Sequence, residues 1–176
     1  MFFTDDLEQI GANMGDMPHP DTNFPNTFTP FNAYVVIVQP TVESVGAYEL
    51  GINLSDPTVF VLSATGPNGW TNFGSPTNHI VGFASPVPCT EVGAVLCTMQ
   101  MLYTGTAVVD IMFNASDPSS FDGMYPGIAD GTDPENLIGC PPTAGEYPDA
   151  IVATINGDGV VATEAHSFSS VKALFD

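Results

Sequence analysis

Large apolar residues alternate with small or polar ones along residues 47–54, and this period of two is the feature that most restricts the fold. Successive side chains of a β-strand point to opposite faces, so the alternation predicts a strand with one buried face. Within residues 107–113, Val109, Ile111 and Phe113 alternate with Val108, Asp110 and Met112. The side chains expected to line one common core are Tyr48, Leu50, Ile52, Leu54, Val109, Ile111 and Phe113, and those expected outside it are Glu49, Asn53 and Asp110.

Further short runs of β-type residues are bounded by Pro, Gly, Asn or Asp, and they occupy residues 31–38, 59–62, 80–83, 94–103 and 150–155. About eight to nine strands separated by turn residues predict an all-β fold, an antiparallel β-sandwich of jelly-roll, cohesin-like or immunoglobulin-like type. Residues 116–149 are rich in Asp, Pro and Gly and lack periodicity, which predicts a long ordered loop.

The length of 176 residues fits one domain. We assign residues 1–164 to a single β-sandwich and residues 165–176 to a C-terminal extension. Apolar residues recur at helical spacing in the extension, which predicts one or two helical turns. We expect the extension to pack on the sandwich or on a neighbouring subunit.

The charge is strongly one-sided, because 20 acidic residues face a single Lys or Arg, Lys172, and the formal net charge is −19. Such a chain repels nucleic-acid phosphates and anionic membrane surfaces, so neither is an expected partner. Its carboxylates must be solvated, bound to cations or hydrogen-bonded to neutral donors. The acidity fits either simple solubility or an extracellular protein, in which scarce Lys and Arg give trypsin-like proteases few cleavage points.

No run of apolar residues reaches the length of a membrane span. The first residues lack the basic and apolar regions of a signal peptide. If the protein is exported, we expect a leader to have been removed before this numbering begins. The expected location is then extracellular or on the cell surface.

Three cysteines, Cys89, Cys97 and Cys140, show no zinc-type spacing. A hairpin that turned near Gly93 would place Cys89 opposite Cys97, so we predict a disulfide between them. The alternative is that both are buried free thiols. Cys140 would then be free or bonded to another chain.

Three carboxylates gather in a loop with Gly and Pro, namely Asp130, Asp133 and Glu135, and oxygen ligands on a bent backbone are those that Ca²⁺ prefers. We predict a calcium site there, although acidic turns also form without metal. Two N-glycosylation sequons begin at Asn53 and Asn114, each on the polar face of its strand. We expect no cofactor beyond calcium and covalent glycans.

No catalytic motif includes His19, His79 or His166, and neither a GxSxG nor an HExxH pattern occurs. We therefore expect a protein that is not an enzyme. A hydrolase that uses paired carboxylates is a weaker hypothesis.

Several segments together resemble secreted bacterial β-sandwich surface proteins of the cohesin-like or immunoglobulin-like kind. They are an opening strand at residues 7–12, the strands at 31–37 and 45–52, a cysteine pair eight residues apart, and the closing residues 163–175. The resemblance implies export and a binding or scaffolding role, and it assigns no functional residue.

Our first functional hypothesis is a structural subunit of an extracellular assembly, such as a surface fibre, filament or layer. Strand edges or terminal segments would join copies of the chain to one another. The apolar residues at the two ends that would make these contacts are Phe2, Phe3, Val171, Leu174 and Phe175.

The alternative hypothesis is a monomeric recognition module for extracellular polysaccharide or other carbohydrate, or for a protein partner. Trp70 and Phe73, with Tyr103 or Tyr125, would then offer stacking surfaces. The same aromatic residues would otherwise belong to the core.

Overall fold

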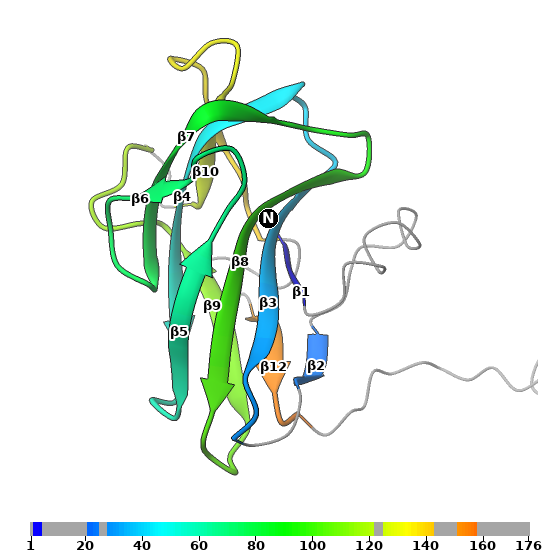
Figure 1. Ribbon diagram of the computed structural model, residues 1–176, viewed down its shortest axis with the longest axis vertical. Helices are drawn as coiled ribbons and strands as arrows, with labels where there is room; N and C mark the ends of the chain where they lie inside the picture. Colours follow the sequence, from blue (N-terminus) through cyan, green and yellow to red (C-terminus); the bar gives the residue numbers. More distant parts are fainter. Residues whose placement is uncertain (1, 5–20, 25–27, 122–124, 143–150, 158–176) are drawn as a thin grey trace, which may run out of the picture.

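The computed structural model describes residues 2–4, 21–24, 28–121, 125–142 and 151–157. These residues form twelve β-strands and no helix, and the strands make two sheets packed face to face (Figure 1). The predicted all-β sandwich is confirmed. No helix in the described part of the chain is long and apolar enough to cross a membrane. The predicted strand at residues 7–12 and the extension at 165–176 lie outside the described residues.

The first sheet, sheet A, has four antiparallel strands in the order β1 (Phe2–Thr4), β3 (Phe31–Val38), β8 (Gly93–Tyr103) and β5 (Val59–Thr65). The two longest strands of this sheet, β3 and β8, lie in its middle. Short β1 forms one edge and β5 forms the other.

The second sheet, sheet B, is built around β4 (Ser44–Leu54). On one side β4 pairs with β7 (Asn78–Pro88), which carries the short β6 (Thr71–Asn72). On the other side β4 pairs with β10 (Gly127–Asp130) along its first half and with β9 (Val109–Asn114) along its second half. Beyond β10, the sheet ends with β11 (Leu137–Gly139). Beyond β9, it continues with β12 (Ile151–Ile155) and ends with β2 (Asp21–Phe24). The β12–β2 pair is parallel.

The alternation along β4 and β9 sets which side chains enter the core, as predicted. Tyr48, Leu50 and Ile52 of β4 are at most 4% exposed, and Val109, Ile111 and Phe113 of β9 are fully buried. The register places Ile52 opposite Phe113. Leu54 is half-buried because it ends β4 and packs at the margin of the core. On the opposite face Asn53 is exposed, and Glu49 and Asp110 are half-buried.

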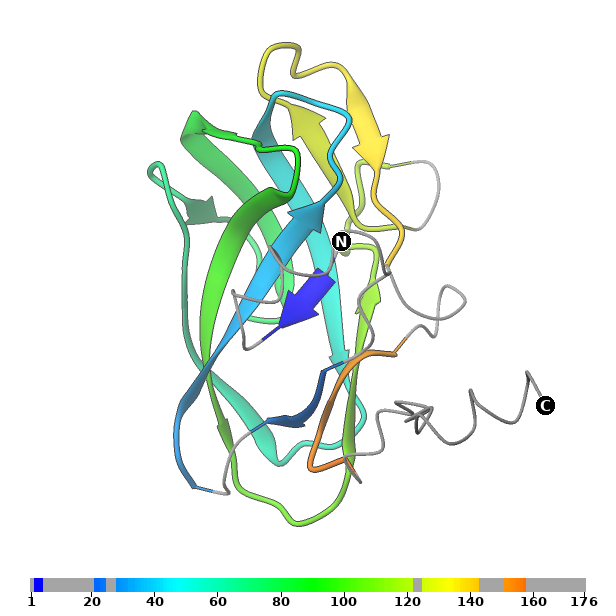
Figure 2. The ribbon, with the colours of Figure 1, turned by 90° about the vertical axis from the view of Figure 1, so that its right-hand side faces the viewer.

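The loop predicted at residues 116–149 contains two strands, so this prediction was wrong in part. β10 and β11 form an antiparallel hairpin at one end of the sandwich (Figure 2). β10 is only four residues long, with Gly127 at its start, and β11 is three residues long. Strands of that length leave no readable alternation, and only pairing identifies them, namely that of β10 with β4 and that of β11 with β10. Residues 143–150 lie outside the described residues.

The hairpin expected between Cys89 and Cys97 does not form, and the disulfide is absent, because the chain changes sheets at this point. Cys89 follows β7 in sheet B, whereas Cys97 lies within β8 of sheet A, opposite Val35 of β3. Gly93 begins β8 at a φ of +153°, and a Cβ there would lie 2.1 Å from the Ile37 carbonyl oxygen. All three cysteines are free thiols in the structure.

The two faces of β4 give a direct stability test. Leu50→Ala should lower the free energy of unfolding by about 2–5 kcal/mol, because it leaves a cavity between the sheets. Asn53→Ala, three residues along on the exposed face, should change it by less than about 0.5 kcal/mol. Urea denaturation measures both values. Equal losses in the two variants would contradict the register.

Candidate functional site

A groove of about 370 Å³ lies on the outer face of sheet B, over β4, β7 and β10. Its floor follows from strand alternation, since Tyr48 and Val81 point into the core and their neighbours point outward. The floor consists of Ala47 and Glu49 of β4, Ile80 and Gly82 of β7, and Ala129 of β10. The walls are Phe73, Phe121, Pro134 and Leu137. The groove is therefore largely apolar, with one carboxylate in its floor.

Two large apolar side chains on the walls of the groove are exposed to solvent. Phe73, in the turn between β6 and β7, is 76% exposed, and Leu137 at the start of β11 is 46% exposed. The Phe73 amide donates to the Ile80 carbonyl at 2.9 Å, which ties this turn to the floor strand. Exposed apolar side chains gathered around a concavity are typical of a binding surface.

Glu49 is held in place by neutral donors from the segment after β9. One carboxylate oxygen accepts from the Ser116 hydroxyl at 2.9 Å and from the Ser120 amide at 2.8 Å. The other oxygen accepts from the Ser120 hydroxyl at 2.6 Å. The single basic residue of the sequence, Lys172, lies outside the described residues. Glu49 thus presents a fixed negative charge, and no described Lys or Arg side chain neutralises it.

Beneath the groove, a buried hydrogen-bonded cluster joins β4, β7 and the segment before β6. The Tyr48 hydroxyl lies 2.9 Å from Nδ1 of His79, and Nε2 of His79 lies 3.1 Å from the Pro76 carbonyl oxygen. A carbonyl only accepts, so Nε2 carries the proton and Nδ1 accepts from Tyr48. Trp70 Nε1 donates to the Tyr48 hydroxyl at 3.1 Å. The cluster fixes the strands that form the groove floor.

The groups in this cluster are neutral near neutral pH. Burial lowers the pKa of His79 to about 4, although the bond to Pro76 opposes the shift. Burial also raises the pKa of Tyr48 well above its ordinary value and raises the pKa of Cys97 to about 11. His79 is fully buried. The arrangement therefore stabilises the sheet and does not offer solvent an acid or a nucleophile.

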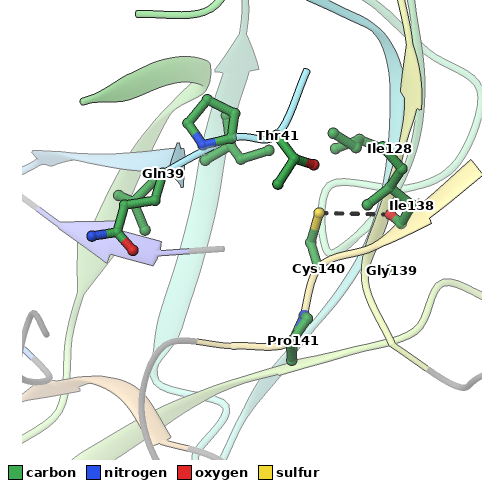
Figure 3. Close-up of a pocket in the computed structure, with 10 residues that line it drawn as sticks. Gln39, Thr41, Ile128, Ile138, Gly139, Cys140 and Pro141 are labelled. Carbon is green, nitrogen blue, oxygen red and sulfur yellow. Dashed lines mark hydrogen bonds between the residues drawn. The ribbon is translucent and has the colours of Figure 1, made fainter. Parts of the chain in front are cut away.

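A second concavity, of about 250 Å³, lies where β3 turns toward β4 and meets β11 (Figure 3). Its lining includes Ile37, Thr41, Ile128 and Cys140. The Cys140 thiol donates to the Ile138 carbonyl at 3.6 Å, and burial raises its pKa. A protonated thiol is a poor nucleophile, so Cys140 does not give this concavity a reactive nucleophile.

The three carboxylates predicted as calcium ligands are not gathered into one set. Asp130 accepts from the Thr132 amide and hydroxyl, both at 2.8 Å, and from the Asn136 amide group at 3.3 Å. These bonds, with the Thr132 amide first, lower the pKa of Asp130. Asp133 accepts from the Glu135 amide at 3.2 Å. The described residues hold no group of three His, Cys, Asp or Glu suited to a metal ion, so calcium binding here stays a prediction.

The two sequon asparagines lie on the outer side of sheet B, where the alternation places them. Asn53 is exposed and Asn114 is half-buried, and Asn114 pairs with Gly51 of β4. Glycosylation itself stays a prediction.

The aromatic residues considered as stacking surfaces differ in their exposure to solvent. Tyr103 is 2% exposed and belongs to the core, and Trp70 is half-buried above Tyr48. Phe73 and Tyr125 are exposed. The sequence offered no signal that separates these two from the others, because exposure depends on which loop each one occupies.

One of the two predicted assembly segments lies within the described residues. Phe2 and Phe3 belong to β1, which pairs with β3 of the same chain, opposite Val36 and Val35. Val171, Leu174 and Phe175 lie outside the described residues.

The fold is similar to that of the sixth cohesin of scaffoldin B from Acetivibrio cellulolyticus, which was solved in complex with a mutant Cel5 dockerin. The match has a TM-score of 0.53 and covers 77% of this chain and 94% of that chain. The sequence identity is 9%, so the likeness shows a cohesin-like β-sandwich fold and nothing finer. No protein-family profile matches the sequence, and no curated protein matches it either.

The buried histidine predicts a pH dependence of stability. The ordinary pKa of 6.5 falls to about 4 in the folded protein. Between these pH values the unfolded chain takes up a proton that the folded chain refuses, so stability falls as the pH falls. The full difference is about 3 kcal/mol. His79→Asn removes the titrating group and keeps an acceptor for Tyr48.

Urea denaturation of both proteins from pH 7 to pH 4 tests this prediction. The wild-type chain should lose more stability over that range than His79→Asn. Both proteins share the same acidic residues, so carboxylate titration cancels in the comparison. Identical pH profiles would show that His79 does not contribute.

Proposed function

We propose that this chain is a non-catalytic protein-interaction module that binds a partner protein in the groove on the outer face of sheet B. The observation that carries the proposal is the combination of exposed Phe73 and Leu137 with the fixed carboxylate of Glu49 in one concavity. The cohesin-like fold supports a recognition role, since the similar cohesin was solved with a bound dockerin.

The groove favours a protein partner over a carbohydrate. Its walls and floor are mostly aliphatic and aromatic, so they offer few hydrogen-bonding groups to sugar hydroxyls. Buried apolar side chains at the centre of an interface contribute most of the affinity between proteins. Trp70 and Tyr103, two of the four aromatics considered for sugar stacking, are directed to the interior.

The charge of the chain indicates the chemistry of the partner. With a net charge of −19, the module attracts a basic surface and repels an acidic one. We therefore propose a partner segment that combines apolar side chains with a Lys or Arg residue. The basic side chain of that residue is directed at Glu49. An exported location fits this role.

A peptide display library selected on the wild-type module tests the proposal. The peptides recovered should contain apolar residues with Lys or Arg. Phe73→Ser should weaken their binding about tenfold or more, because it removes an exposed anchor of the groove. Val108→Ser is the control, since Val108 is 50% exposed but lies between β8 and β9, outside the groove lining.

Isothermal titration calorimetry gives the dissociation constants. Glu49→Gln should weaken binding of the basic peptides and reduce the dependence of their affinity on salt. Peptides that bind Phe73→Ser as tightly as wild type would show that the groove is not the binding site.

A second candidate function is the structural subunit of an extracellular assembly. What supports it is β1, in which Phe2–Thr4 pair with β3 at the edge of sheet A within the same chain. The same addition between neighbouring copies would produce a polymer.

Deletion of residues 165–176 tests whether the C-terminal extension joins subunits. We expect filaments or oligomers seen by negative-stain microscopy to be lost. A full-length chain with Ser at positions 171, 174 and 175 separates the loss of apolar contacts from the loss of length. Assemblies that persist unchanged in both variants would contradict the proposal.

A further inference from the structure

The free edge of sheet A is formed by β5, which pairs with β8 on one side only. No strand among the described residues pairs with its other side, and β5 is the outermost strand of sheet A in Figure 1. Its sequence, Val-Phe-Val-Leu-Ser-Ala-Thr, contains no Pro and no charged residue. Natural sheets commonly protect an edge with Lys, Pro, a β-bulge or a very short strand. This edge is seven residues long and has no Lys or Pro, and the register shift between Val61 and Ser63 is the one such device that it shows.

An apolar patch lies on the outer face of sheet A beside this edge. Phe60 is 51% exposed and Leu62 is 48% exposed, and Phe60 lies directly opposite Leu102 of β8. Leu102 is half-buried. A seven-residue strand edge with large apolar side chains next to it offers both backbone hydrogen bonds and apolar burial to an added strand.

The distribution of charge indicates which occupant this edge accepts. No Asp, Glu, Lys or Arg occurs from residue 57 to residue 90, although the chain carries 20 acidic residues. Two copies with a net charge of −19 each repel one another over most of their surfaces. The segment that contains β5 adds no Asp or Glu of its own to a contact with a second copy.

We propose that β5 pairs antiparallel with β5 of a second copy about a two-fold axis, so that two A sheets become one continuous sheet. A two-fold axis perpendicular to the sheet places identical strands antiparallel, and the same patch then serves both partners. If the axis passes near Leu62, the two Leu62 side chains meet, and Asp56 of each copy faces the uncharged segment that follows β5 in the other. This interface is distinct from the groove and from the terminal segments.

Like charges at the centre of the interface test this pairing. Leu62→Glu would place two carboxylates opposite each other in an already anionic dimer. Val108→Glu makes the same change in net charge at a similarly exposed apolar position outside β5, in the loop between β8 and β9. Sedimentation velocity over a wide range of concentration, at low and at high salt, gives the dimer dissociation constant of the full chain.

We expect the wild-type chain to dimerise reversibly, more tightly at high salt, because salt screens the repulsion between copies. Leu62→Glu should raise the dissociation constant at least about tenfold, and Val108→Glu should leave it within about twofold. A chain that stays monomeric at every concentration would overturn the proposal. Equal weakening by the two substitutions would overturn it as well.

Cross-linking then tests the geometry. Under mild oxidation Leu62→Cys should form a covalent dimer, whereas Val108→Cys and the wild-type chain should not. Phe73→Ser, which tests the groove, and deletion of residues 165–176 should both leave this dimer unchanged. Loss of groove binding or of terminal assembly is therefore distinguishable from loss of β5 pairing.

Discussion

The near absence of basic side chains is the constraint on which this structure depends. With one Lys or Arg among 176 residues, carboxylates here cannot be neutralised by internal ion pairs. Neutral donors take that role, as Ser116 and Ser120 do for Glu49 and as Thr132 and Asn136 do for Asp130. Asp56 follows the same rule, because the Thr58 amide donates to its carboxylate at 2.8 Å. The fold must then be held by apolar burial and by backbone pairing.

The same constraint shapes the surfaces available for binding. The uncharged segment from residue 57 to residue 90 contributes β5, Phe73 and β7, and thus part of both the groove and the free edge of sheet A. The buried Tyr48–His79–Trp70 cluster lies beneath the groove, so the strands of the groove floor are fixed by hydrogen bonds within the core.

Strand alternation made much of the sandwich predictable. The run at residues 31–38 coincides with β3, and the inward phase of Tyr48, Leu50 and Ile52 is as predicted. The predictions failed where strand pairing joins segments that are distant in the sequence. β10 and β11 are too short to show a period, and their place beside β4 depends on contacts some eighty residues apart in the sequence. Cys89 and Cys97 are close in sequence but lie in different sheets, which no local pattern reveals.

The sequence by itself determined the class of fold, the core phase of β4 and β9 and the polyanionic character, because these follow from local periodicity and composition. Only the tertiary structure decided which aromatic residues are exposed, and it placed Phe73 on a groove wall and Tyr103 in the core. It also placed Glu49 among serines that lie far along the chain. Burial and hydrogen-bond partners are properties of packed segments, so they are set only when distant strands meet.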